Sequence, residues 1–264
     1  MYFKKSLNVL KKLLRFSIKR FTLYKFDSIM NIIASLIFLI GSIFFWVVIT
    51  DAGFYISDWS LKEILIFIAF SELFFGIDEY LFSSASDFWM LIFSGNLDTQ
   101  LTRPFDPRKR FIILNMNFIG LLTTCIKFVV IVSISKYSFY IPNLLIGIFI
   151  VIIGSISFMF LRFTISYLGF WLEKMDALTE ICHCLTKFNK YPNIIFPRLI
   201  KLCFTTIFPF YFFSTFPAEL VTNKLTTNNL IILCIAMIGN FFLWININKI
   251  VWKRGRKRYE SLNG

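Results

Sequence analysis

The feature that most constrains this chain is a set of apolar runs long enough to cross a lipid bilayer. The clearest run, residues 29–50, reads IMNIIASLIFLIGSIFFWVVIT and carries no charged side chain. The hydrocarbon core of a bilayer is about 30 Å thick, so a spanning helix needs about 20 apolar residues. The chain is 57% hydrophobic and contains 35 phenylalanines, which is far more apolar than a typical soluble domain. The sequence therefore predicts an integral membrane protein.

Six stretches reach this length, and we expect an all-α membrane protein with six transmembrane helices. The second stretch contains acidic side chains, and Pro209 and Pro217 interrupt the fifth. The expected spans form one transmembrane domain, residues 29–252, and cover about residues 29–50, 61–82, 111–135, 144–172, 199–216 and 229–251.

The distribution of Lys and Arg predicts which end of the bundle faces the cytosol. Four segments, 1–28, 83–110, 173–198 and the basic tail 253–264, hold eight, four, four and five of these residues. The alternate connections hold only Lys136 and Lys224. Cytoplasmic loops of membrane proteins carry the excess of Lys and Arg. We therefore expect a multi-pass protein with cytosolic N- and C-termini.

The N-terminal segment, residues 1–28, has its own pattern. Apolar residues from Phe3 to Phe21 recur every three or four positions and are flanked by Lys and Arg. This spacing predicts an amphipathic helix lying on the cytosolic face of the bilayer, although the cations could also serve only as an orientation signal. The net charge of +13 lies in clusters between apolar runs, which indicates membrane orientation and no nucleic-acid partner.

Five ionisable side chains fall inside the expected spans. Charged groups at membrane depth are costly and usually face the bundle interior or a cavity. Helical rise places Arg162 near Glu79 and Lys127 near Glu72, so each could form an ion pair. Structural ion pairs and a substrate or ion pathway are both consistent with the full set, which is Glu72, Asp78, Glu79, Lys127 and Arg162.

The chain has no sequence signature of an enzyme. The single histidine excludes paired-histidine zinc sites and histidine-based triads, and no stretch matches the G-x-x-x-x-G-K-[ST] nucleotide-binding loop. Cys182-His183-Cys184 lacks the spacer and the second ligand pair of a zinc site, so we expect no metal centre.

The prolines of the fifth span, in IFPFYFFSTFPAEL, predict a break in the helix near the outer face. Broken backbone at membrane depth is tolerated only where protein or a water-filled cavity covers it. We interpret residues 209–228 as a re-entrant or interfacial helical hairpin that caps the outer side. An ordinary kinked span followed by a loop is the alternative.

Three stretches together resemble a known family. GNLDTQLTRPFDP at residues 95–107 resembles the Gly-x-Leu-Asp-x-x-Leu-x-Arg-Pro loop of exporter-type ATP-binding-cassette permease subunits. KYPNIIFPRL with the following IFPFYFFSTFPAEL is similar to the proline-containing elements around the fifth span of that family, and VWKRGRKRYESLNG is more loosely similar to its basic tail. The likeness is narrowest to a bacterial subfamily of six-span permeases, which implies a location in the bacterial cytoplasmic membrane.

The resemblance implies that the loop at 94–110 contains a short cytosolic coupling helix that docks on a separate ATPase subunit. The residues implied in coupling are Asp98, Leu101, Arg103, Pro104, Pro107 and Arg108. It also implies that ATP and magnesium are bound by that partner, with no cofactor in this chain. A second permease chain, identical or related, would complete the transporter.

The family likeness further implies efflux along the interface between two permease chains, lined by spans two and five. The aromatic residues expected on this path are Phe74, Phe75, Phe208, Phe210, Tyr211 and Phe212. An ion-coupled secondary transporter or channel that uses the intramembrane carboxylates is the main alternative, and a membrane scaffold is another. An internal repeat with two broken helices would favour the secondary transporter, and only one proline-broken span is evident.

Overall fold

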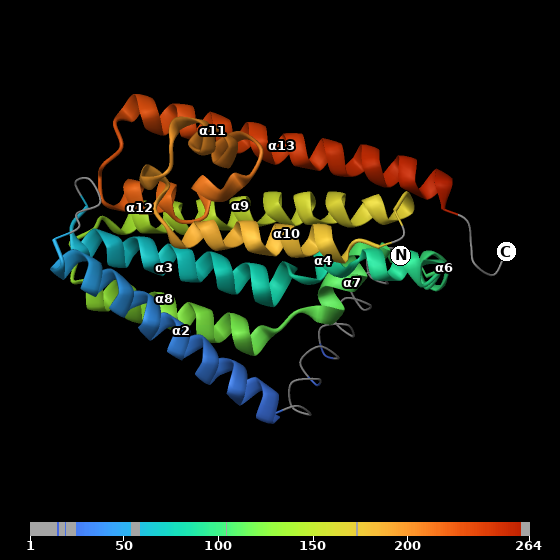
Figure 1. Ribbon diagram of the computed structural model, residues 1–264, viewed down its shortest axis with the longest axis horizontal. Coiled ribbons are helices and arrows are strands. Elements are labelled where there is room, and N and C mark those ends of the chain that lie inside the picture. Colours follow the sequence, from blue (N-terminus) through green and yellow to red (C-terminus); the bar gives the residue numbers. More distant parts are fainter. Residues whose placement is uncertain are drawn as a thin grey trace.

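The computed structural model describes residues 15, 19, 25–53, 59–103, 105–172 and 174–259 (Figure 1). The described residues form helices joined by turns. The α-helices are α2 (Lys25–Asp51), α3 (Leu61–Ile77), α4 (Ser84–Asp87), α5 (Trp89–Phe93), α6 (Leu97–Leu101), α7 (Pro107–Asn115), α8 (Phe118–Ser135), α9 (Ile141–Ser166), α10 (Asp176–Thr186), α11 (Arg198–Thr206), α12 (Thr215–Val221) and α13 (Thr227–Arg258). Five shorter helical segments join them: the π-helix η1 (Asp78–Phe82) and the 3-10 turns η2 (Tyr167–Phe170), η3 (Lys187–Lys190), η4 (Asn193–Ile195) and η5 (Pro209–Phe212).

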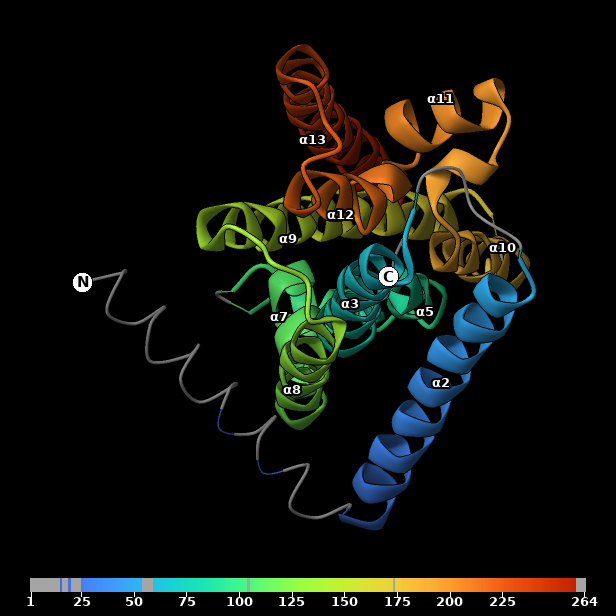
Figure 2. The same ribbon diagram turned by 90° about the vertical axis from the view of Figure 1, so that its left-hand side faces the viewer.

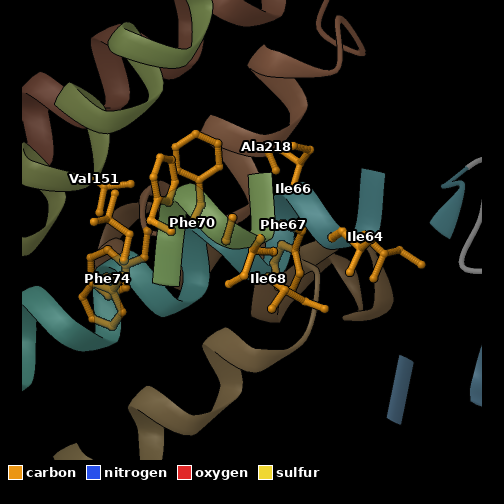
Figure 3. Close-up of a cluster of buried hydrophobic side chains, with 14 of the residues drawn as sticks. Ile64, Ile66, Phe67, Ile68, Phe70, Phe74, Val151 and Ala218 are labelled. Carbon is orange, nitrogen blue, oxygen red and sulfur yellow. The ribbon is translucent and has the colours of Figure 1, made fainter. Parts of the chain in front are cut away.

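Helix α3 forms the centre of the bundle. It is apolar around its whole circumference, and twelve of its 17 residues are buried. Viewed along the bundle, α8, α9 and α12 surround α3, and α2 and α13 lie at the periphery (Figure 2). A helix that is hydrophobic on every side is stable only when neighbours cover all of it. Phe70, Phe74 and their neighbours therefore make the main hydrophobic core with Val151 and Ala218 (Figure 3).

The contact between α3 and α8 depends on a glycine. A Cβ atom built on Gly76 would lie 2.0 Å from the Oγ1 atom of Thr124, so the two backbones approach more closely than any other residue allows. Small residues commonly permit such close packing between membrane helices.

Side-chain caps define several helix starts. The Glu63 carboxylate accepts a hydrogen bond from the backbone N–H of Ser60 at 2.6 Å and so caps α3. Asp106 caps α7, Asn117 caps α8 and Thr226 caps α13 in the same general way. Ser, Thr, Asp and Asn are the preferred residues at this position because their oxygens satisfy free backbone N–H groups.

The connections separate into two groups at opposite ends of the bundle. The turns after α8 and α12 lie at one end, whereas α6, α7 and the C-terminal end of α13 lie at the other (Figure 1). The first group carries Lys136 and Lys224, and the second carries the cations of residues 103–110 and of the end of α13. Below, the two ends are called the outer end and the cytosolic end, following the orientation expected from the sequence.

The described residues are helical, as the sequence predicts for a membrane protein. The number of helices that could span a bilayer differs from the expected six. Four of the described helices are long and apolar enough to cross a bilayer: Ile29–Asp51, Phe118–Ser135, Ile141–Phe170 and Thr227–Arg258. The pair Arg198–Thr206 and Pro209–Val221, bent by 76°, makes a fifth if it is one span. The stretch expected as the second span is helical, but its α3 part has only 17 residues before the π-helix. The total of six stays a prediction.

The sequence predicts that residues 187–193 belong to a cytosolic loop, and the structure instead packs them against the bundle. Hydroxyl groups of Ser71 and Ser214 donate hydrogen bonds to the carbonyl oxygen of Asn189 at 3.2 and 3.4 Å. Ser71 is ten residues into α3, which is about 15 Å along that helix. The segment therefore packs against the bundle, with Asn189 and Asn193 buried. Neighbouring side chains satisfy the Asn189 carbonyl and the Asn193 N–H, as non-helical backbone at membrane depth requires. Hydropathy missed this because α10 and the turns after it contain no long apolar run.

The C-terminal boundary of the expected transmembrane domain, residue 252, lies within a helix, because α13 continues into the tail as far as Arg258. The amphipathic helix expected over 1–28 falls almost wholly outside the described residues.

Candidate functional site

The short helix α6 at the cytosolic end lies within the loop at 94–110. Gly95 precedes it with φ of +70°, a conformation that glycine adopts without strain. Leu97 is fully buried in a cluster with Phe88 and Ile112, which fixes the helix to the bundle. Leu101 is 37% exposed at the other end of α6. The helix is thus anchored on one side and open on the other.

The C-terminal end of α13 also holds α6 in place. The Tyr259 hydroxyl donates a hydrogen bond to the Gly95 carbonyl at 3.2 Å. Burial and the neighbouring Asp98 carboxylate raise the pKa of Tyr259. Two elements that are 164 residues apart in sequence therefore meet at this loop.

Two of the arginines expected in coupling have different surroundings. Arg103 is exposed, and its Nε donates to the Thr99 carbonyl at 3.2 Å. Arg108 instead forms an ion pair with Asp106 at 2.6 Å and lies over the Trp252 ring, 5.1 Å from its centroid. Pro107 is the first residue of α7 and Pro104 lies outside the described residues. Arg103 is therefore exposed at the cytosolic end, whereas Arg108 mainly ties α7 to α13.

The Asp106 carboxylate has its pKa lowered. Burial acts to raise the pKa, and the hydrogen bonds and charge of Arg108 outweigh it. The carboxylate also accepts from the backbone N–H of Arg108 at 2.9 Å. A single side chain thus caps α7 and holds the arginine.

A second group of charged side chains lies inside the bundle, around the π-helix η1. The Arg162 Nη2 atom donates to Asp78 Oδ2 at 2.6 Å, and Lys127 Nζ donates to Glu72 Oε2 at 2.7 Å. The second pair is the one that the sequence suggested. The first corrects the expected partner of Arg162, which is Asp78 and not Glu79, because the π-helix changes the angular spacing of side chains at this point.

These pairs border a cavity of about 430 Å³ at membrane depth, which we call the charged pocket. Its walls come from α2, α3, η1, α8, α9, α10 and η3. The ionisable side chains in the walls are Glu72, Asp78, Glu79, Tyr80, Lys127, Arg162, His183, Lys187 and Lys190. π-bulges are frequent at functional sites.

A second cavity of about 590 Å³ lies at the outer end, and its lining includes Tyr211, Glu219 and Lys224. Residues 209–221 turn back into the bundle, so the observed bend occurs where the re-entrant hairpin was expected. The Tyr211 hydroxyl donates to the Glu219 carboxylate, and Lys224 forms an ion pair with Glu63 at 3.2 Å. The 76° bend fits either a re-entrant hairpin or a broken span, so both interpretations of residues 209–228 stay open.

A family model described as an ABC-2 family transporter protein matches residues 36–263. The chain belongs to this family. The searches of curated proteins and of solved structures return no match. Membership makes the chain a membrane component of an ATP-binding-cassette transporter and not itself the catalytic subunit.

The aromatic residues expected to line a path through this ABC-2 protein have mixed positions. Phe74, Phe210 and Phe212 are almost fully buried within the protomer, where Phe74 stacks on Phe213. These three cannot present a surface in this conformation, because aromatic rings close to the proline break fill the core. Phe75 borders the charged pocket and Tyr211 borders the outer cavity, and Phe208 is half-buried.

Sequence reasoning missed the lysines of the charged pocket. Lys187 and Lys190 were counted as loop cations, and their position was set only by the fold. One signal could have found them. The two lysines are three residues apart at the end of an amphipathic helix, and residues with this spacing share one helix face. Among the described residues, no group of three or more His, Cys, Asp or Glu side chains is arranged to hold a metal ion.

Proposed function

We propose that this chain is the permease subunit of an ATP-binding-cassette exporter and that it couples to a separate cytosolic ATPase through α6 and the loop that follows it. ATP and magnesium would be bound by the ATPase. The observation that carries the proposal is the family match over residues 36–263. The anchored position of α6 at the cytosolic end supports the assignment of the docking element.

The surroundings of α6 suit a rigid mechanical link. Leu97 is buried and Tyr259 holds the Gly95 carbonyl, so a force on α6 is passed to α13 and to the cluster around Phe88. The backbone N–H of Trp89 donates to the Ser166 hydroxyl at 2.6 Å, which joins α5 to α9. From there the chain leads back through α4 and η1 to α3 at the centre. Movement of the ATPase would thus reach the spans without being absorbed by a loose loop.

We further propose that the exporter contains a second permease chain in a bacterial cytoplasmic membrane. The apolar faces of α2 and α13 support this arrangement, because only 11% of the most apolar window of each helix is buried in the protomer. Lipid and a second chain would share these faces.

Reversal of two exposed cations at the docking loop tests the proposal. The variant Arg103→Glu plus Lys109→Glu is co-expressed with an ATP-binding-cassette ATPase encoded beside the chain, and the amount of ATPase that co-purifies is measured. Both side chains are exposed, so folding should be unaffected. We expect the native chain to retain the ATPase and the variant to lose most of it.

A matched control makes the same change of charge at the other end of the molecule. Lys62→Glu plus Lys136→Glu alters two exposed lysines at the outer end and should leave co-purification unchanged. Equal retention by the docking-loop variant and the control would disprove the role of this loop. Absence of the ATPase from the native chain as well would disprove the coupling to an ATPase.

A further inference from the structure

The charged pocket contains buried polar atoms that nothing in the described part of the chain satisfies. Arg162 is 2% exposed, and its Nε and Nη1 atoms have no hydrogen-bond partner. The Oδ1 atom of Asp78 is also without one. Leaving such groups unpaired away from water is costly, and more so for charged groups. These three atoms belong to two residues that line the charged pocket, which has room for a ligand.

The remaining cations give the pocket a preference for negative charge. The printed ion pairs use Glu72 and Asp78 on Lys127 and Arg162. Lys187 and Lys190 also line the pocket and take part in no ion pair within the part of the chain that the structure describes. Glu79 is the one further carboxylate in the walls, and the other titratable groups there are His183 and the Tyr80 phenol. Positive charge is thus in excess.

The apolar part of the walls favours a ligand with a hydrocarbon tail. Phe38 and Phe75 both lie near the Lys190 ammonium, with ring centroids 5.9 and 5.8 Å from its Nζ. Phe38 is 72% exposed, so the apolar surface continues from the pocket onto the outside of α2. A molecule held in the pocket could therefore extend its tail along α2 into the bilayer.

We propose that the charged pocket binds the oxyanion headgroup of an amphiphile, with Arg162, Lys187 and Lys190 contacting the headgroup. A phosphate or carboxylate group matches the two free guanidinium donors, because arginine presents its N–H groups in a planar fork that fits oxyanions. Asp78 Oδ1 would accept a hydrogen bond from a hydroxyl or amine on the same headgroup. This inference deepens the proposed function, since it names the chemical class of the cargo.

Native mass spectrometry of the full chain in detergent tests the assignment with three probes. These are phosphatidic acid, diacylglycerol with the same acyl chains, and inorganic phosphate as a competitor. We expect phosphatidic acid to bind and diacylglycerol to bind much more weakly, because it lacks the oxyanion. Millimolar inorganic phosphate should not displace phosphatidic acid. Complete displacement would mean that the site accepts a soluble oxyanion, and the assignment to an amphiphile would be overturned.

The variant Lys187→Gln plus Lys190→Gln should weaken the binding of phosphatidic acid by about 25-fold, since each cation near an anionic lipid contributes about fivefold in affinity. Both side chains are exposed, so the variant should fold. Lys253→Gln plus Lys257→Gln removes the same charge from the tail and should change binding by no more than about twofold. Unchanged binding in the first variant, or an equal loss in both, would overturn the proposal.

Arg162→Lys separates recognition of the headgroup from net charge. The lysine keeps a cation beside Asp78 but lacks the planar fork of the guanidinium, so we expect weaker binding of phosphatidic acid at unchanged melting temperature within a few degrees. Co-purification of the ATPase is measured on the same samples. A pocket variant that loses lipid but retains ATPase supports the pocket alone, whereas loss of ATPase from the native chain would disprove the proposed function and leave the binding result standing.

Discussion

Two aspartate–arginine pairs, Asp78–Arg162 and Asp106–Arg108, have the same Oδ2–Nη2 distance of 2.6 Å and opposite surroundings. The side chains of the first pair are 7% and 1% exposed, and its partners are 84 residues apart. Those of the second are 30% and 27% exposed and only two residues apart.

The comparison shows that distance alone does not measure what a pair contributes. In the first pair, both charges have lost their water, so each depends on the other. In the second pair, water and the ring of Trp252 also stabilise the arginine, and the aspartate has a further role as the cap of α7. Removal of one partner should therefore have a large effect in the bundle and a small one at the cytosolic end.

The largest effect is expected for Arg162→Gln. It leaves the Asp78 carboxylate buried without a cation, which typically destabilises a fold by about 3–5 kcal/mol. The melting temperature of the detergent-purified chain should fall strongly. The double variant Arg162→Gln plus Asp78→Asn removes both charges and should recover most of the loss. A fall no larger than that of Asp106→Ala would refute the comparison.

An intermediate effect is expected for Lys127→Gln. The Lys127–Glu72 pair has side chains 8% and 17% exposed, between the values for the other two pairs. We expect a loss of about 2 kcal/mol, because Glu72 retains some access to solvent or to the charged pocket. The same change at the exposed Lys62 is the matched control and should cost no more than about 0.5 kcal/mol. Thermal melting of both variants measures the difference.

A smaller effect is expected for Asp106→Ala, which removes the cap of α7 and the partner of Arg108. Loss of such a cap costs about 1 kcal/mol. Asp106→Asn keeps an oxygen that can accept from the backbone N–H of Arg108, and it should recover most of the loss. If the alanine and asparagine variants melt at the same temperature, the ion pair and not the cap is what stabilises α7.

The smallest effect concerns pH. Because the folded pKa of Asp106 is lowered, its contribution to stability is present above the ordinary carboxyl pKa of about 3.9 and is lost as pH falls through the folded pKa. The difference in melting temperature between the native chain and Asp106→Asn should therefore be constant near neutral pH and shrink in acid. A difference that grows on acidification would contradict the lowered pKa.

The sequence was a good guide wherever composition and periodicity carried the information. Long apolar runs predicted α2, α8, α9 and α13, and the prolines of the fifth span predicted a break where the structure bends. The Lys127–Glu72 pair followed from helical rise alone. In contrast, α10 and the turns after it are short and amphipathic, so hydropathy assigned them to a cytosolic loop.

The positions of single side chains were harder to predict. A π-helix begins at Asp78, and because of it the partner of Arg162 is Asp78 and not the expected Glu79. Arg108 looked like a free docking cation, but Asp106 and Trp252 hold it. Phe74 and Phe212 looked suited to a path, whereas they fill the core.

The sequence by itself determined that this chain is a helical membrane protein with a cation-rich loop at one end, because hydrophobic length and charge distribution act along the chain and can be read in order. Only the tertiary structure decided which charges face one another, which aromatic rings are covered, and that Lys187 and Lys190 join Arg162 around one cavity. These outcomes depend on helix rotation and on contacts between residues far apart in the sequence, and hydropathy does not contain that information.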